Sequence, residues 1–214
     1  MAPPKKSRRV RPQALSPLLP ALRALCELLK QSHRPGIVIG GVAASLLGHP
    51  RLTADVDATV AIDDRDLESF LRLAEAEGLT PRNTHPGDFL RRSAMLLLRH
   101  DATGIHIDIN QARLPFEHAA AGRARMRRFG EISIPMPTPE DVIVMKAVAH
   151  RPKDLEDIRG IAESQPKLDI PYIRKHVQEF AQALDMPQLW EDVRRLIERQ
   201  EGRVARRSRP KRTP

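Results

Sequence analysis

The sequence predicts an α+β fold, with a mixed β-sheet flanked by helices and followed by a C-terminal helical bundle. Two observations lead to this prediction. Up to residue 136, short apolar or alternating segments are interspersed with amphipathic ones, which is typical of strands and helices packed in layers. From Thr138 onward every segment has helical periodicity, and several begin with proline, which favours the first turn of a helix.

The first half begins with a helix expected at residues 16–31, where leucines fall on one face. A short apolar strand at 37–39 leads into two glycines and a helix of small residues at 42–47. Residues 55–62 alternate polar and apolar side chains, which predicts a half-buried strand. The other elements expected here are a helix at 67–77, strands at 94–98 and 105–109 joined by a turn, a helix at 116–126 and a strand at 131–134.

The second half is expected to contain only helices, at 139–150, 153–164, 171–184 and 187–200. We therefore divide the chain into an α+β core and a helical region, with a basic arm at each end. The expected boundaries are 1–12 for the first arm, 13–136 for the core, 137–201 for the helical region and 202–214 for the second arm. Both arms are expected to be disordered, because like charges with proline repel one another and bury nothing.

The net charge of +9 is concentrated in those arms. Residues 1–12 carry five Lys or Arg and residues 202–214 carry six, with no acidic residue in either segment. The 189 residues between them therefore have a net charge of −2. A polyanionic partner is indicated for the ends of the chain rather than for its folded body.

The composition excludes several classes of protein. No apolar run approaches the ~18 residues that a membrane span needs, so no membrane partner is expected. The absence of a signal-peptide pattern and the presence of a single cysteine, Cys26, favour a cytoplasmic location and exclude a cysteine-based zinc site. Aromatic residues make up 3% of the chain, which is too few for a base-stacking platform for single strands.

The most informative side chains are three aspartates on expected strands. Asp55 and Asp57 are two residues apart, so their carboxylates leave the same face of one strand. Asp108, in the segment GIHIDIN, could join them from a neighbouring strand. A divalent cation would relieve the repulsion, and two such ions can assist phosphoryl or nucleotidyl transfer. The alternative to a metal-binding role is that Asp55 and Asp57 are solvent-exposed polar positions on a strand, without a function.

Gly40 and Gly41 lie between the expected strand and helix, where backbone N–H groups can approach a phosphate. The segment matches neither a Walker loop nor a dinucleotide-binding fingerprint. Its alternative interpretation is a tight turn. The ordered combination of strand, glycines, helix, D-x-D strand and later strand aspartate is more specific than any single part.

This combination resembles the nucleotidyltransferase superfamily that shares the DNA polymerase β-type core. A longer string resembles its AbiEii/MenT-type toxin branch and extends over about residues 35–165. The first half of that string is G-G-x-A…R-x-T-x-D-x-D, formed by Gly40, Gly41, Ala43, Arg51, Thr53, Asp55 and Asp57. The second half is E-D-x-x-x-x-K followed by K/R-D-x-x-D, formed by Glu140, Asp141, Lys146, Lys153, Asp154 and Asp157.

The resemblance implies a two-metal Mg²⁺ site, with Mn²⁺ as an alternative ion and an NTP as co-substrate. Its metal ligands would be Asp55, Asp57 and Asp108, which with Lys146 form the expected catalytic set. The expected nucleotide-binding residues are Gly40, Gly41, Ser45, Arg51, Thr53 and Asp154. Ser45 is included because Gly41 occupies the position at which many relatives have a serine, so Ser45 could supply the missing phosphate contact. Lys146 and Asp154 retain structural alternatives, as a surface lysine and a helix-capping acid.

We expect an enzyme that moves an NMP from an NTP to an acceptor hydroxyl, preferably at the 3′ end of tRNA, with a cognate antitoxin as a possible partner. Within the same fold, an aminoglycoside- or lincosamide-type antibiotic, or a protein hydroxyl, is the competing acceptor. The alternative to an enzyme is a catalytically inert protein that keeps this fold and binds nucleic acid. The basic arms favour RNA, since phosphate contacts by Lys and Arg dominate nucleic-acid affinity.

Overall fold

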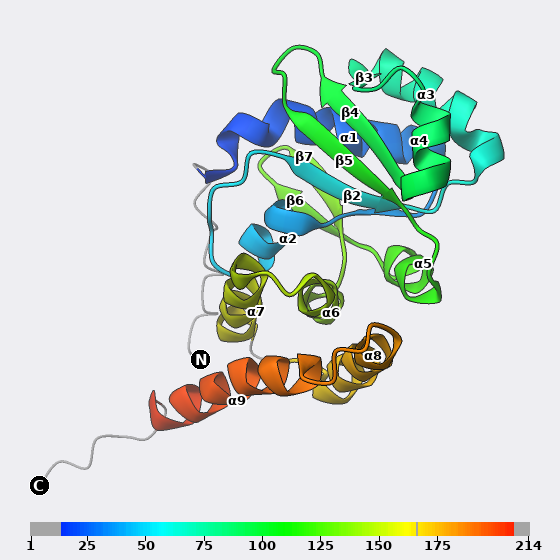
Figure 1. Cartoon of the computed structure of the whole chain (residues 1–214). Coiled ribbons are helices and arrows are strands. Elements are labelled where there is room, and N and C mark those ends of the chain that lie inside the picture. Colours follow the sequence, from blue (N-terminus) through cyan, green and yellow to red (C-terminus); the bar gives the residue numbers. More distant parts are fainter. Residues whose placement is uncertain (1–13, 166, 208–214) are drawn as a thin grey trace, which may run out of the picture.

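The computed structural model describes residues 14–165 and 167–207. It confirms the predicted α+β architecture, in which a mixed sheet flanked by helices is followed by a helical region (Figure 1). The predicted arm at 1–12 and the last part of the second arm, 208–214, lie outside the described residues.

The central sheet has five strands in the order β1-β2-β5-β4-β3. Their bounds are β1 Gly36–Val38, β2 Val56–Val60, β3 Leu79–Pro81, β4 Met95–His100 and β5 His106–Gln111. Strands β2 and β5 are parallel, whereas the other three neighbouring pairs are antiparallel. A separate two-stranded antiparallel sheet is formed by β6 (Arg125–Phe129) and β7 (Ile132–Met136).

The two faces of the central sheet have different side chains, because alternate residues of a strand point to opposite faces. On β5, Ile107 and Ile109 are buried, whereas His106, Asp108 and Asn110 between them are exposed or half-buried. The apolar face packs with α1 (Leu19–Ser32) and α3 (Leu67–Ala76) into the main core. The polar face carries the aspartates that the sequence singles out.

Helix α2 (Gly40–Leu47) directly follows β1, and α4 (Pro86–Ser93) and α5 (Pro115–Gly122) flank the sheet. Two short 3₁₀ helices, η2 (Ser16–Leu18) and η3 (Asp64–Asp66), precede α1 and α3. The C-terminal helices are α6 (Pro139–Ala149), α7 (Pro152–Ser164), α8 (Ile170–Ala183) and α9 (Leu189–Arg207). In Figure 1, α6 and α7 lie between the sheet and the outer pair α8 and α9.

Several segments differ from the expected elements, and strand β3 and helix α4 were not expected. The helix expected at 116–126 ends at Gly122, and Arg125–Phe129 becomes strand β6, whose backbone hydrogen-bonds to β7. Helix α9 continues past the expected boundary at residue 201 to Arg207. Within the described residues, no helix is long and apolar enough to cross a membrane.

Candidate active site

The turn between β1 and α2 brings the backbone against Asp57. Gly40 has a φ of +64°, and a Cβ at this position would lie 1.9 Å from Asp57 Oδ2. The N–H of Gly41 donates a hydrogen bond to the same carboxylate. A Cβ on Gly41 would lie 2.5 Å from Thr53 Oγ1. Both glycines are therefore needed for the close approach of this turn to the acidic strand.

The three predicted aspartates meet at the parallel pair of strands. Asp57 on β2 lies directly opposite Asp108 on β5, so both side chains are on the polar face. Asp55 immediately precedes β2, and its Oδ1 accepts a hydrogen bond from Thr53 Oγ1 at 3.0 Å. The parallel register therefore places side by side two carboxylates that are far apart in the sequence.

The close approach of the three carboxylates makes it unfavourable for Asp57 to be ionised. Burial raises the pKa of Asp57 above its ordinary value, and the negative charges of Asp55 and Asp108 raise it further. The Gly41 hydrogen bond and the positive charge of Lys146 lower this pKa and offset part of the effect. A divalent cation would stabilise the ionised form, and carboxylate oxygens are the ligands that Mg²⁺ prefers. The donor chemistry therefore suits the metal that the resemblance implies.

The third carboxylate is already paired in this structure. Asp108 Oδ1 accepts a hydrogen bond from Arg82 Nη2. Across residues 14–165 and 167–207, no three His, Cys, Asp or Glu side chains are arranged so that they could hold a metal ion. A site that includes Asp108 therefore requires side-chain rearrangement.

Behind the turn lies a network of five charged side chains. Lys146 Nζ on α6 lies 2.9 Å from Asp154 Oδ1 and 2.9 Å from Asp157 Oδ2, both on α7. Arg51 makes a two-point contact with Asp157, at 2.7 and 2.8 Å, and Arg151 Nε lies 2.6 Å from Asp154 Oδ2. Because the network has three cations and two carboxylates, its own net charge is positive, and it lies beside Gly40 and Gly41.

The two carboxylates of this network are stabilised in their charged form. Burial alone would raise the pKa of Asp154, but hydrogen bonds from Arg151 and Lys146 outweigh it, and the net pKa is lowered. The pKa of Asp157 is lowered in the same way, by Arg51 and Lys146 against burial. Lys146 and Asp154 therefore hold each other in place at the edge of the site.

A cavity of about 290 Å³ connects the network to the acidic strand. Its charged and backbone lining includes Gly40, Asp57, Lys146, Arg151 and Asp154. Its apolar lining includes Leu114, Phe116, Val142, Met145 and Phe180, with Thr59, Asn110 and Glu117 as further polar groups. A cavity with both kinds of lining can take a ligand that has a charged part and an apolar part.

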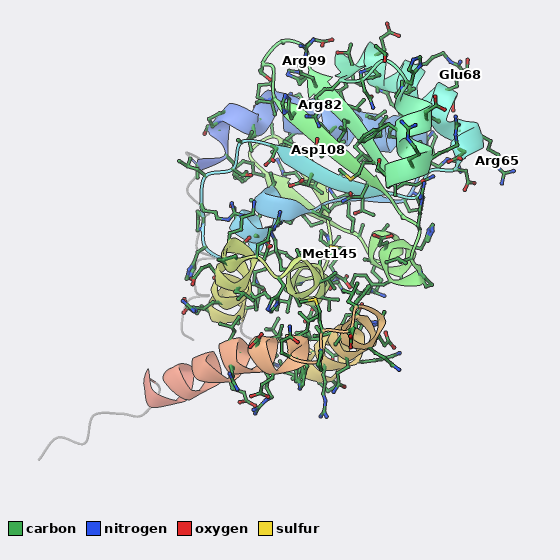
Figure 2. All side chains as sticks on the ribbon, viewed as in Figure 1. Arg65, Glu68, Arg82, Arg99, Asp108 and Met145 are labelled. Carbon is green, nitrogen blue, oxygen red and sulfur yellow. The ribbon has the colours of Figure 1, made fainter. Side chains whose placement is uncertain are left out.

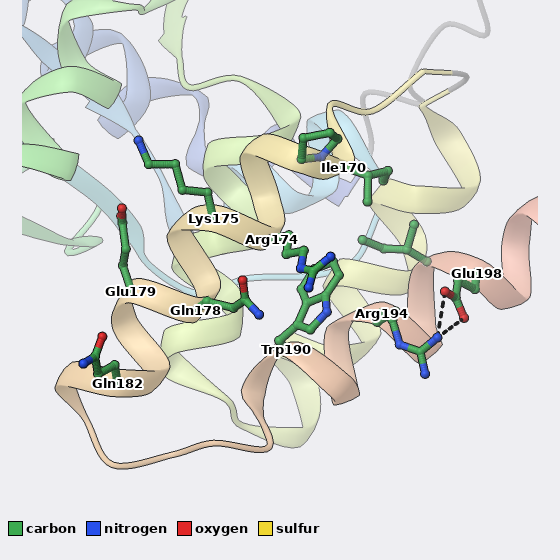
Figure 3. A pocket seen from close by; sticks show the side chains of 11 residues that line it. Ile170, Arg174, Lys175, Gln178, Glu179, Gln182, Trp190, Arg194 and Glu198 are labelled. Carbon is green, nitrogen blue, oxygen red and sulfur yellow. Dashed lines mark hydrogen bonds and ion pairs between the residues drawn. The ribbon is translucent and has the colours of Figure 1, made fainter.

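A larger groove of about 880 Å³ runs between α8 and α9 (Figure 3). The Arg174 guanidinium lies 5.9 Å from the centre of the Trp190 ring. Arg194 is engaged by Glu191 and Glu198, as the dashed lines to Glu198 in Figure 3 show in part. The described lining of this groove lacks a carboxylate cluster of the kind seen at Asp57, so the smaller cavity is the candidate active site.

A family model described as a nucleotidyltransferase of unknown function, DUF6036, matches residues 17–201. The chain belongs to this nucleotidyltransferase family. No curated protein shows significant similarity to it. The match does not decide whether this nucleotidyltransferase belongs to the AbiEii/MenT-type branch, which remains a prediction.

Two solved structures are similar to this nucleotidyltransferase. One is the solution structure of the antibiotic-resistance factor ANT(2'')-Ia, with 15% identity and a TM-score of 0.47, covering 90% of this chain and 95% of the other. The second is an antigenic nucleotidyltransferase-like protein from Paracoccidioides brasiliensis, with 14% identity and a TM-score of 0.45, covering 85% of this chain and 94% of the other.

Several predicted nucleotide-binding residues contact protein groups. Ser45 is fully buried; its hydroxyl donates to the Arg51 carbonyl at 3.1 Å and accepts from the Arg51 N–H at 3.3 Å. It therefore positions the Arg51 loop and does not face the cavity. Thr53 contacts Asp55, and Arg51 contacts Asp157. Of this set, Gly40 and Asp154 line the cavity, as does the predicted catalytic Lys146.

Asp141, from the E-D-x-x-x-x-K segment, has a structural role in this nucleotidyltransferase. It is fully buried and accepts hydrogen bonds from the side chains of Thr138, Arg123 and Tyr172. With Thr138 it forms a capping box at the start of α6. This contact fixes the helix that carries Lys146.

Sequence reasoning missed three residues at the site. Arg151 and Asn110 line the cavity, and Arg82 holds Asp108. Arg151 lies two residues before Lys153 in the K/R-D-x-x-D segment, a position that could have indicated it. Asn110 lies two residues after Asp108 and so shares its face. Arg82 gave no comparable signal, because β3 was not expected.

Replacing Gly40 by Ala should destabilise the protein more than the same change at Gly78. Both have positive φ, but a Cβ on Gly78 would meet nothing within 4 Å. We expect Gly78→Ala to cost about 1–2 kcal/mol from backbone strain alone. Gly40→Ala should cost about 2–4 kcal/mol, because it also displaces the Asp57 carboxylate. Denaturant unfolding measures both losses, and equal losses would contradict the close contact.

Proposed function

We propose that this protein is a divalent-metal-dependent nucleotidyltransferase that transfers an NMP from an NTP to an acceptor hydroxyl. The observation that carries the proposal is the position of Asp57 directly opposite Asp108, with Asp55 beside them and a cation-rich network at the same cavity. Membership of the nucleotidyltransferase family supports the reaction class.

Asp55 and Asp57 would hold the metal, and Asp108 would join them once Arg82 has released it. A bound Mg²⁺ would neutralise charge on the triphosphate and on the leaving pyrophosphate. Lys146 and Arg151, which line the cavity with Asp57, would attract the same phosphates. Such fixed cations stabilise charge that develops as the α–β phosphate bond breaks.

Asp108 would also handle the proton of the acceptor hydroxyl. The new bond joins that oxygen to the α-phosphorus, and pyrophosphate leaves with the electron pair of the broken bond. Asp108 could accept the hydroxyl proton, because its half-buried carboxylate lies on the polar face beside Asp57.

We propose RNA, in particular the 3′ end of tRNA, as the preferred acceptor. The basic residues of segments 1–12 and 202–214 would hold its phosphate backbone. Arg125 and Arg128 add exposed positive charge on β6. A cognate antitoxin remains an expected partner only if the toxin-like resemblance holds.

A screen of acceptors tests this proposal. The protein is incubated with Mg²⁺, each α-labelled NTP in turn, and total tRNA, an aminoglycoside, a lincosamide or the protein alone. We expect label on tRNA. Label on an antibiotic or on protein would keep the reaction and replace the acceptor. No label on any acceptor from any NTP would contradict the enzyme and favour an inert relative.

The apolar lining of the cavity would suit the nucleobase, with Asn110 as a hydrogen-bonding group. Within residues 14–165 and 167–207, the Asn110 side chain has no hydrogen-bond partner, so its amide is available to a ligand. We expect Asn110→Ala to weaken binding of the preferred NTP roughly tenfold and to reduce discrimination among the four NTPs.

Equilibrium binding of each NTP measures this change. Gln182→Ala is the matched control, since it removes an exposed amide from the other groove, on α8. Unchanged affinities and unchanged base preference in Asn110→Ala would contradict the contact of the base with Asn110 in this cavity.

A further inference from the structure

Arg82 lies in line with the acidic pair across the sheet. Its backbone N–H donates to the Leu97 carbonyl at 2.9 Å, just beyond the end of β3. Leu97 lies opposite Asp108, and Asp108 lies opposite Asp57. The polar face therefore carries one row that runs from Arg82 over Leu97 to the two carboxylates.

The Arg82 side chain reaches along this row to β5. Nη2 donates to Asp108 Oδ1, and Nη1 lies 3.1 Å from His106 Nδ1. Figure 2 labels Arg82 and Asp108 close together on the face of the sheet. Because the backbone of Arg82 is tied to β4 and its side chain has rotatable bonds, the guanidinium can leave Asp108 without a change in the sheet.

The pair is partly shielded from water. The exposed fractions of the Arg82 and Asp108 side chains are 24% and 27%. Their attraction is therefore stronger than that of a fully exposed ion pair, yet the contact remains open to exchange with solvent and ions. The guanidinium neutralises one of three carboxylates that would otherwise repel one another.

We propose that Arg82 is a built-in counter-ion of Asp108 that competes with a divalent cation for this carboxylate. This inference rests on the proposed function, in which Asp108 is a metal ligand. A divalent cation at Asp108 repels the guanidinium, and the guanidinium already uses one carboxylate oxygen, so each weakens binding of the other.

Binding of Mn²⁺ without nucleotide tests the competition, with free Mn²⁺ followed by electron paramagnetic resonance. We expect Arg82→Ala to bind Mn²⁺ about fivefold more tightly than wild type, the change expected when one partly exposed competing ion pair is lost. Arg99→Ala is the matched control: it removes an arginine from the neighbouring strand β4 that lies 3.7 Å from Asp101. The control should bind Mn²⁺ like wild type.

A double-variant cycle shows whether Arg82 acts through Asp108. In an Asp108→Ala background, Arg82→Ala should raise Mn²⁺ affinity clearly less than it does in the wild-type background, because only repulsion between the guanidinium and the cation remains. Equal affinity of wild type and Arg82→Ala, weaker binding by Arg82→Ala, or the same gain without Asp108 would each overturn the inference. If wild type and all variants fail to bind Mn²⁺, the metal site of the proposed function fails as well. Circular dichroism verifies that each variant is folded.

Discussion

Replacing Asp57 by Asn should reduce NMP transfer by about a hundredfold to a thousandfold, the loss seen when a fixed charge-stabilising group is removed from an active site. The side chain keeps its size, so it still fits against Gly40. It loses the negative charge that would hold the cation between Asp55 and Asp108. Initial rates of label transfer from an α-labelled NTP measure the change.

The same variant should be more stable than wild type at neutral pH. The raised pKa of Asp57 means that its ionised form destabilises the folded state. That cost is fully present above the raised pKa and disappears as pH falls below the ordinary value of 3.8. The stability gained by Asp57→Asn should therefore shrink in acid. Denaturant unfolding over a pH series shows the trend.

Asp63→Asn is the matched control for Asp57→Asn, because Asp63 is an exposed acid shortly after the same strand. It should keep wild-type activity and wild-type stability. Activity retained by Asp57→Asn, or lost equally by both variants, would contradict the position of the site.

Replacing Asp154 by Ala should lower the free energy of unfolding by about 1–3 kcal/mol, the cost of removing one of the two carboxylate partners of the buried Lys146 ammonium. The exposed fractions of the Lys146 and Asp154 side chains are 7% and 0%. Removal of Asp154 leaves Lys146 with Asp157 alone and removes the acceptor of the Arg151 N–H at the start of α7. Denaturant unfolding measures the loss.

Glu156→Ala tests whether burial is the cause. Glu156 is on the same helix and pairs with Arg159 at 3.0 Å in an exposed position, so its loss should cost at most about 0.5 kcal/mol. Because the pKa of Asp154 is lowered, its stabilisation is present above 3.8 and is lost as pH falls through the folded value. Similar losses for Asp154→Ala and Glu156→Ala would contradict the buried network.

The main elements of the fold could be predicted because hydrophobic periodicity is local information. The alternation at 55–62 located β2, observed at Val56–Val60, and the apolar run at 105–109 located β5. The short edge strand β3 was missed: it has three residues and ends in Pro81, which suits an edge but is atypical of strands. Strand β6 was missed because its arginine-rich segment forms a strand only by pairing with β7.

The acidic residues of the site could be named from the sequence, but their contacts could not. The register that places Asp57 opposite Asp108 depends on how two distant strands pair. The contact of Arg51 with Asp157 joins residues 106 positions apart. Ser45 was assigned to phosphate binding by analogy, whereas tertiary packing buries its hydroxyl against the Arg51 backbone. Charge partners of this kind are set by packing and leave no local pattern.

Transfer of an NMP from an NTP is tested most directly by finding which products carry the label of α-labelled and of γ-labelled NTP. Wild-type protein is incubated with Mg²⁺, the NTP and the acceptor found in the screen, and the products are separated. We predict that the α label appears on the acceptor, that the γ label appears in pyrophosphate, and that the two amounts are equal. The γ label on the acceptor, or its release as inorganic phosphate without transfer, would contradict nucleotidyl transfer at Asp57.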